Sequence, residues 1–265
     1  MAKKSPPTSL LHYTSLEAFF SMIKDVYEGK SDNLNVHLSN IRMMNDLGEY
    51  NLIMDKFLTN SKSKQIIRNQ IEQIILNDGD IFVYSLMRSD KFRMGKIPMW
   101  KMYADNCKGV KLRFNYKNLN SHLSNLSNGF DYMLKECKYF TINEINKKVA
   151  EYNYCFKKNK CDSEDSEYIN LLNSLLNEVS FIKYKYWEYE SEYRIVVRSK
   201  SNKFKLTPRG LVKYHELPIP ISLLEEVQIG PSANLVTTKE SLETIKRTLF
   251  KSAKFNISES KLLIN

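Results

Sequence analysis

The stretch Trp187-Glu188-Tyr189-Glu190-Ser191-Glu192-Tyr193-Arg194-Ile195-Val196-Val197 is the strongest indication of both a strand and a site. Its aromatic and β-branched residues predict a strand, on which side chains alternate between two faces. Carboxylates two residues apart on a strand are about 7 Å from each other, close enough to reach one bound sugar. The alternative is a solvated strand face on which an arginine balances the acids. One face would carry Glu188, Glu190, Glu192 and Arg194, and the other Trp187, Tyr189, Tyr193, Ile195 and Val197.

The chain has 265 residues, of which 42% are hydrophobic, enough to bury one sizeable core. We expect a single domain over residues 1–265, with a mostly helical lobe inserted at about residues 115–183. The N-terminal Met-Ala-Lys-Lys-Ser-Pro-Pro lacks the apolar run of a secretion signal, and no later segment is long and apolar enough to span a bilayer. The protein is therefore expected to be soluble and cytoplasmic, without a membrane partner.

The charge balance favours polyanionic partners. The chain has 40 Lys and Arg against 30 Asp and Glu, a formal charge of +10. A basic surface attracts nucleic acid, so RNA or DNA is the expected partner. The alternative is that the Lys- and Asn-rich composition only reflects a biased genome.

Metal and nucleotide-loop motifs are missing from the sequence. The four cysteines form no Cys-x-x-Cys pair, and the four histidines are equally dispersed, so we expect neither a metal nor a disulfide framework. A Gly-x-Gly-x-x-Gly motif and a phosphate loop are also missing, which disfavours Rossmann and P-loop nucleotide sites.

The expected elements are short strands and amphipathic helices that do not alternate regularly, which indicates an α+β fold. Ser15 is the predicted N-cap of the first helix. Asn45 and Asp46 supply turn and capping chemistry for the second. Strands are expected at residues 10–14, 34–38, 81–87, 109–114, 132–140, 187–197, 227–231 and 254–263, with one or two more between 204 and 217. Helices are expected at 16–27, 46–58, 64–76, 98–104, 142–156, 165–182 and 239–250.

Other candidate site residues lie in the first half of the chain. His12 and Thr14 share a face at the end of a strand, although a lone histidine is more often structural. Ser85 starts the polar end of a buried strand, where it runs into a loop. Trp100 and Tyr103 are three residues apart and would share a helix face, where core packing is the usual fate of such a pair.

Several segments, taken together and in order, resemble a bacterial family known as the domain-of-unknown-function 2971 family. The family's layout is in turn similar to the ADP-ribosyltransferase fold, a split, mainly antiparallel sheet that clamps NAD in a cleft. The segments are Leu11-His12-Tyr13-Thr14-Ser15-Leu16; Met44-Asn45-Asp46 with Glu49; Pro98-Met99-Trp100 with Tyr103-Ala104 and Gly109-Val110; Trp187, Glu190 and Glu192-Tyr193-Arg194-Ile195; and Val227-Gln228-Ile229-Gly230-Pro231.

The resemblance implies roles for the candidate residues. His12, with Tyr13 and Thr14, matches the early strand that holds the adenosine-side ribose, and Trp100 or Tyr103 would supply the aromatic against nicotinamide. Ser85 corresponds only loosely to the expected middle-strand serine. Glu190 and Glu192 match the glutamate pair, either of which could be catalytic. We expect Glu192 to stabilise the positive charge on the sugar and Glu190 to orient or deprotonate the incoming nucleophile. Arg194 would contact the pyrophosphate or keep the glutamates ionised by charge pairing.

The leading hypothesis is therefore an NAD-dependent ADP-ribosyltransferase that modifies a macromolecule, with nucleic acid preferred as the acceptor over protein. The resemblance suggests a toxin of a toxin–antitoxin system or an anti-phage defence effector, for which an antitoxin or chaperone protein would be a further partner. Alternatives are an NAD glycohydrolase and a non-catalytic module that binds NAD, ADP-ribose or nucleic acid. A weaker rival is a nuclease that holds Mg²⁺ on the glutamate row. The central prediction is that His12 and Glu192 meet across one cleft.

Overall fold

The computed structural model describes residues 5–44, 50–51, 53–56, 64–89, 97–126, 129–158, 166–207, 210–249 and 254–262. The chain divides into two compact units. Unit 1 consists of Met1–His37, Ser85–Gly129 and Glu216–Asn265, and unit 2 of Leu38–Tyr84 and Phe130–His215. The divisions between the units fall inside the strands β2 (Asn33–Asn40), β3 (Asp80–Arg88) and β10 (Gly210–Pro220).

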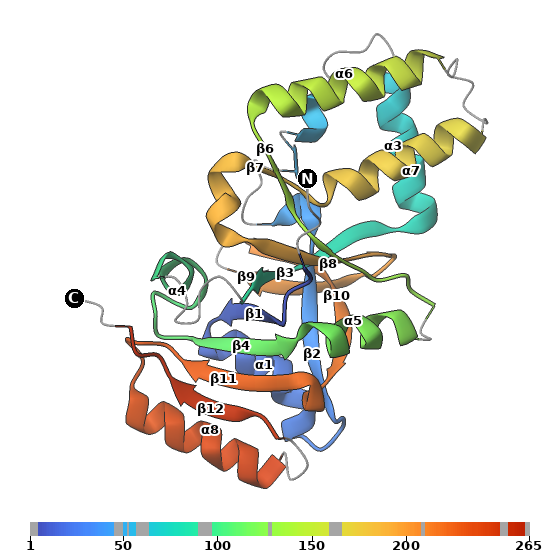
Figure 1. The fold of residues 1–265 in the computed structure, drawn as a ribbon. Coiled ribbons are helices and arrows are strands. Elements are labelled where there is room, and N and C mark those ends of the chain that lie inside the picture. Colours follow the sequence, from blue (N-terminus) through green and yellow to red (C-terminus); the bar gives the residue numbers. More distant parts are fainter. Residues whose placement is uncertain are drawn as a thin grey trace. The chain divides into compact units, whose positions relative to one another are not determined.

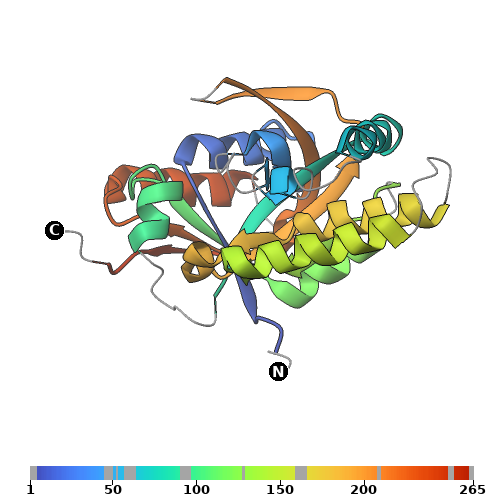
Figure 2. The same cartoon turned by 90° about the horizontal axis from the view of Figure 1, so that it is seen from above.

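Unit 1 is built on a mainly antiparallel sheet. Strand β1 pairs antiparallel with β4 on one side and with the end of β3 on the other, and β4 pairs antiparallel with β11. Only β11 and β12 pair in parallel among the described strands of this unit. Helix α1 contacts α8, as Figure 2 shows. The elements are β1 (Ser9–Thr14), α1 (Leu16–Tyr27), α4 (Ile97–Tyr103), β4 (Val110–Asn115), α5 (Tyr116–Asn125), η3 (Ile221–Leu223), β11 (Leu224–Ile229), α8 (Leu235–Leu249) and β12 (Asn256–Glu259).

Helix α1 illustrates how the local sequence specifies an element. The Ser15 side chain accepts a hydrogen bond from the backbone N–H of Ala18 at 3.0 Å, which satisfies one of the unpaired amides at the helix start. The apolar residues recur at helical spacing and form a single buried face. They are Phe19, Met22, Ile23 and Val26.

Unit 2 combines antiparallel strands with long helices (Figure 1). Strand β5 pairs antiparallel with β8, β8 pairs with β3, and β9 pairs antiparallel with β10, while β6 and β7 form a separate parallel pair. Helices α6 and α7 lie side by side in both views (Figures 1 and 2). The elements are η1 (Ile41–Met43), α3 (Lys64–Asp78), β5 (Met133–Glu136), β6 (Lys138–Phe140), α6 (Ile142–Lys158), α7 (Ser166–Val179), β7 (Ile182–Tyr184), η2 (Lys185–Glu190), β8 (Glu192–Ser199) and β9 (Lys203–Thr207).

The predicted α+β class with a mainly antiparallel sheet is confirmed. The likeness to the ADP-ribosyltransferase fold stays a prediction. The single domain with an inserted lobe at about residues 115–183 stays a prediction; within that range, α5 belongs to unit 1, and α6 and α7 belong to unit 2. The predicted caps at Asn45 and Asp46 lie outside the described residues.

Candidate active site

The prediction of one continuous strand from Trp187 to Val197 is wrong. Residues Lys185–Glu190 form the 3₁₀ helix η2, and strand β8 starts only at Glu192. Ser191 between them has a left-handed backbone, with φ 49° and ψ 48°, which breaks the alternation of a strand. The alternating polar and aromatic pattern therefore belongs to two elements that meet at a sharp turn.

The turn separates Glu188 from the other two glutamates. The Glu188 side chain is about half exposed, and its Oε2 lies 2.9 Å from Nζ of Lys185. Glu190 and Glu192 are only 3% and 4% exposed. The predicted row of three glutamates is thus a buried pair and one surface residue.

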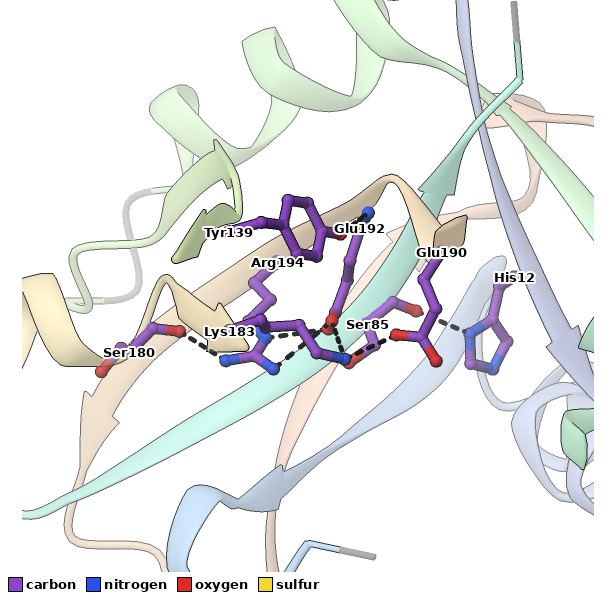
Figure 3. Close-up of polar contacts among 8 residues, drawn as sticks. All are labelled: His12, Ser85, Tyr139, Ser180, Lys183, Glu190, Glu192 and Arg194. Atoms are coloured by element: carbon purple, nitrogen blue, oxygen red, sulfur yellow. Dashed lines mark hydrogen bonds and ion pairs between the residues drawn. The ribbon is translucent and has the colours of Figure 1, made fainter. Parts of the chain in front are cut away.

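Glu192 and Arg194 are two residues apart on β8 and point to the same buried face, as the strand period requires. The Arg194 Nε donates to Glu192 Oε1 at 2.8 Å, and Nη2 donates to Oε2 at 3.3 Å. The remaining guanidinium nitrogen, Nη1, donates to the backbone carbonyl of Ser180 at 2.8 Å (Figure 3). This bidentate pair fixes the orientation of the Glu192 carboxylate.

A lysine that the sequence analysis did not single out joins the two glutamates. Lys183 lies on β7, and its Nζ is 2.5 Å from Glu190 Oε2 and 2.8 Å from Glu192 Oε2 (Figure 3). The same Nζ lies 5.6 Å from the ring centre of Trp187, within the range of a cation–π contact. Its signal in the sequence is a lysine directly after the apolar residues Phe181 and Ile182, where a buried lysine requires a carboxylate partner.

These four side chains form a buried, electrically balanced group, which we call the four-charge cluster: Lys183, Glu190, Glu192 and Arg194. Each is at most 5% exposed at its side chain. Burial by itself raises the pKa of the Glu192 carboxyl, but Arg194 and Lys183 outweigh it and lower that pKa to about 2. Glu192 is therefore ionised throughout the physiological pH range.

Tyr139 supports the start of β8 from the neighbouring strand β6. Its hydroxyl oxygen accepts a hydrogen bond from the backbone N–H of Glu192 at 2.6 Å. Burial raises the pKa of the Tyr139 phenol well above its ordinary value, so the group stays neutral. The backbone of Glu192 and its carboxylate are thus both held in place.

The remaining candidates of the early strand lie in unit 1. His12 on β1 is half-buried, and its Nδ1 donates to the backbone carbonyl of Ser85 on β3 at 3.0 Å. This contact assigns the proton to Nδ1, so a neutral ring carries its lone pair on Nε2. Thr14 is buried at 6% exposure. The prediction that His12 and Glu192 meet across one cleft stays a prediction.

The aromatic candidates of unit 1 differ in exposure. Trp100 on α4 is completely buried, and its ring packs edge-on against Tyr13 with ring centres 5.0 Å apart. Both belong to one apolar core cluster with Leu11, Met87 and neighbouring residues. Tyr103 is half-buried and packs against that cluster. Of the two candidates for contact with nicotinamide, Tyr103 is the one that solvent reaches.

Within the described part of the chain, no group of three or more His, Cys, Asp or Glu side chains is arranged to hold a metal ion. The described cysteines Cys107, Cys137 and Cys155 form no disulfide. No described helix is both long enough and apolar enough to cross a membrane.

Residues 99–195 match a family model described as a protein of unknown function, DUF2971. The matched range contains Trp100, Tyr103 and the complete four-charge cluster. No curated protein and no solved structure matches the chain.

Proposed function

We propose that the protein is an NAD-dependent ADP-ribosyltransferase that modifies a macromolecule, preferably RNA or DNA, and that it acts as a toxin or an anti-phage effector. The observation that supports this function is the buried pair Glu190 and Glu192, whose carboxylates both form an ion pair with Lys183. All three residues lie in the range matched by the family of unknown function. The formal charge of +10 favours a polyanionic acceptor.

In this reaction the bond between nicotinamide and the ribose C1′ breaks, and nicotinamide leaves with the bonding electron pair. Positive charge develops on the sugar, and a fixed carboxylate stabilises it where it develops. An oxygen or nitrogen nucleophile of the acceptor then bonds to C1′ and loses its proton to a base. The chemistry thus needs one permanently ionised carboxylate and one proton acceptor.

The two glutamates suit these two tasks differently. A carboxyl with a pKa of about 2 is a weak base at neutral pH, because general-base catalysis works best near the operating pH. Glu192 therefore suits electrostatic stabilisation and acceptance of a hydrogen bond from the ribose 2′-hydroxyl. Glu190 is then the residue that orients or deprotonates the acceptor.

A label-transfer experiment tests this proposal. The protein is incubated with NAD labelled on the adenylate phosphate, together with RNA, DNA or a cell lysate. Label is expected on a macromolecule with wild type and to fall about 10²–10³-fold with Glu192→Gln. Glu188→Gln is the matched control, since that residue belongs to the same segment but is exposed. Release of free ADP-ribose without labelled macromolecule would instead identify an NAD glycohydrolase.

A non-catalytic binding module is the second candidate, and the charge neutrality of the four-charge cluster supports it. Two cations neutralise two carboxylates at no more than 5% exposure, as a purely structural ionic group would. Such a module would bind NAD, ADP-ribose or nucleic acid without releasing nicotinamide. Binding by wild type without nicotinamide release over a long incubation would select this candidate over the enzyme.

A further inference from the structure

A row of polar side chains crosses four neighbouring strands of unit 1. Lys111 on β4 is in register with Tyr13 on β1 and with Gln228 on β11, and Gln228 is in register with Ser258 on β12. Because strand side chains alternate, Lys111 lies on the opposite face from Val110 and Leu112. A lysine in the middle of a sheet is unusual, and this one is completely buried.

Two of the buried donors near this row that have no hydrogen-bond partner among the described residues lie close together. They are the Lys111 ammonium nitrogen Nζ and the indole nitrogen Nε1 of Trp100. Lys111 Nζ lies over the Trp100 ring, 6.0 Å from its centre, at the outer limit of a cation–π contact. Buried polar groups are nearly always hydrogen-bonded, so two unsatisfied donors so close together need an explanation.

The carboxylate in the next row does not supply the missing partner. Glu226 pairs with Arg113, at 3.0 Å between Oε2 and Nη2, and its Oε1 accepts from Ser258 at 2.5 Å. Burial lowers the pKa of the Lys111 amine to about 8, with a smaller opposing effect from Glu226. The ammonium form still predominates at pH 7. A buried positive charge is costly unless an opposite charge accompanies it.

We propose that Lys111 and Trp100 line an anion site inside unit 1, occupied by a halide or by a small carboxylate or phosphate group. An anion accepts hydrogen bonds from both donors and neutralises the ammonium, whereas a water molecule satisfies the donors and leaves the charge. Since solvent does not reach either side chain, the site is closed and admits only a small ion. This proposal is independent of the ADP-ribosyltransferase function.

Thermal unfolding at constant ionic strength tests the proposal. Chloride, bromide, acetate and phosphate are each exchanged against gluconate, which is too bulky for a closed site. With the anion that fits, the wild-type midpoint is expected to rise by about 3 °C for each tenfold increase in concentration above the Kd. The four arms distinguish a halide from a carboxylate and from a phosphate.

Three variants connect this response to the site. Lys111→Met keeps the length of the side chain and should abolish the response, and Trp100→Phe should weaken anion binding about fivefold. Lys205→Met is the control, because Lys205 is a half-buried lysine whose Nζ also lies over an aromatic ring, that of Tyr214, but it belongs to unit 2. It should leave the response unchanged.

Crystals grown with bromide provide a readout that does not depend on the variants folding. The proposal expects an anomalous peak within hydrogen-bonding distance of Lys111 Nζ when a halide is the occupant, and oxyanion density there when phosphate or acetate is. Water alone at that position, or an equal anion response in wild type and Lys111→Met, would overturn it.

Discussion

Lys183 and Glu192 lie on different strands of unit 2, and their Nζ and Oε2 atoms are 2.8 Å apart. The same Nζ reaches Glu190, so a single ammonium group connects both candidate catalytic carboxylates. The contact joins the end of the helical region to the start of β8. The positions of Glu190 and Glu192 therefore depend on Lys183, which lies outside the stretch from Trp187 to Val197.

Lys183→Met should therefore destabilise the protein strongly. It leaves two buried carboxylates with one cation, and loss of one partner from a buried charge group costs about 3–5 kcal/mol. Urea unfolding followed by circular dichroism measures the change. Lys185→Met, which removes the exposed pair with Glu188, should change the unfolding free energy by less than about 1 kcal/mol. Equal effects of the two variants would contradict the role given to the cluster.

The stability of the folded protein should fall in acid because of Glu192. Its pKa is about 2 in the folded chain against an ordinary 4.5, which corresponds to about 3 kcal/mol of stabilisation. Because the folded-state pKa is the lower one, this contribution is fully present above pH 4.5 and is lost as the pH falls toward 2. Unfolding free energies measured between pH 7 and pH 3 should show a steeper loss for wild type than for Glu192→Gln. Parallel pH profiles would rule out the assigned charge state.

Substitutions at Ser191 test the turn between η2 and β8. Glycine adopts the left-handed region readily, so Ser191→Gly should stay within about 1 kcal/mol of wild type. A β-branched residue is strained there, so Ser191→Val should cost about 1–3 kcal/mol more than glycine does. Thermal unfolding compares the two. If valine were tolerated as well as glycine, the continuous strand that the sequence suggests would be the better description.

His12 should contribute to NAD binding if the proposed function holds. We expect His12→Ala to raise the KM for NAD at least about tenfold and to leave the fold intact. His122→Ala is a matched control, because its ring also contacts a backbone carbonyl, that of Pro218 at 3.0 Å. Nicotinamide release measured over a range of NAD concentrations separates KM from kcat. An unchanged KM for His12→Ala would remove this residue from the binding site.

Local sequence patterns were sufficient for most elements of the fold. The apolar spacing and the Ser15 cap predicted α1, and the aliphatic run after residue 80 predicted β3. Period and propensity could not reveal the turn at Ser191, since a left-handed serine leaves no mark in an alternating pattern. The fold class followed from short, irregularly alternating segments, whereas the division into two units depends on contacts between distant residues.

The sequence predicted the two glutamates and the arginine of the candidate site, but not its lysine. Glu190, Glu192 and Arg194 were recognisable from their spacing, and the structure brings them together. Lys183 was missed because its partners are seven and nine residues away across a helical turn and become neighbours only in the fold. Trp100 is a residue that the sequence suggested for stacking against a ligand but that the structure buries completely in the core.

The most direct test of the account is the release of nicotinamide and the transfer of labelled ADP-ribose, measured together for four proteins. These are wild type, Glu190→Gln, Glu192→Gln and the exposed control Glu188→Gln. We predict that Glu188→Gln matches wild type, that Glu192→Gln loses both activities about 10²–10³-fold, and that Glu190→Gln loses transfer more than nicotinamide release. Wild-type protein that binds NAD but releases no nicotinamide with any acceptor, or a Glu192→Gln variant with full activity, would contradict the account.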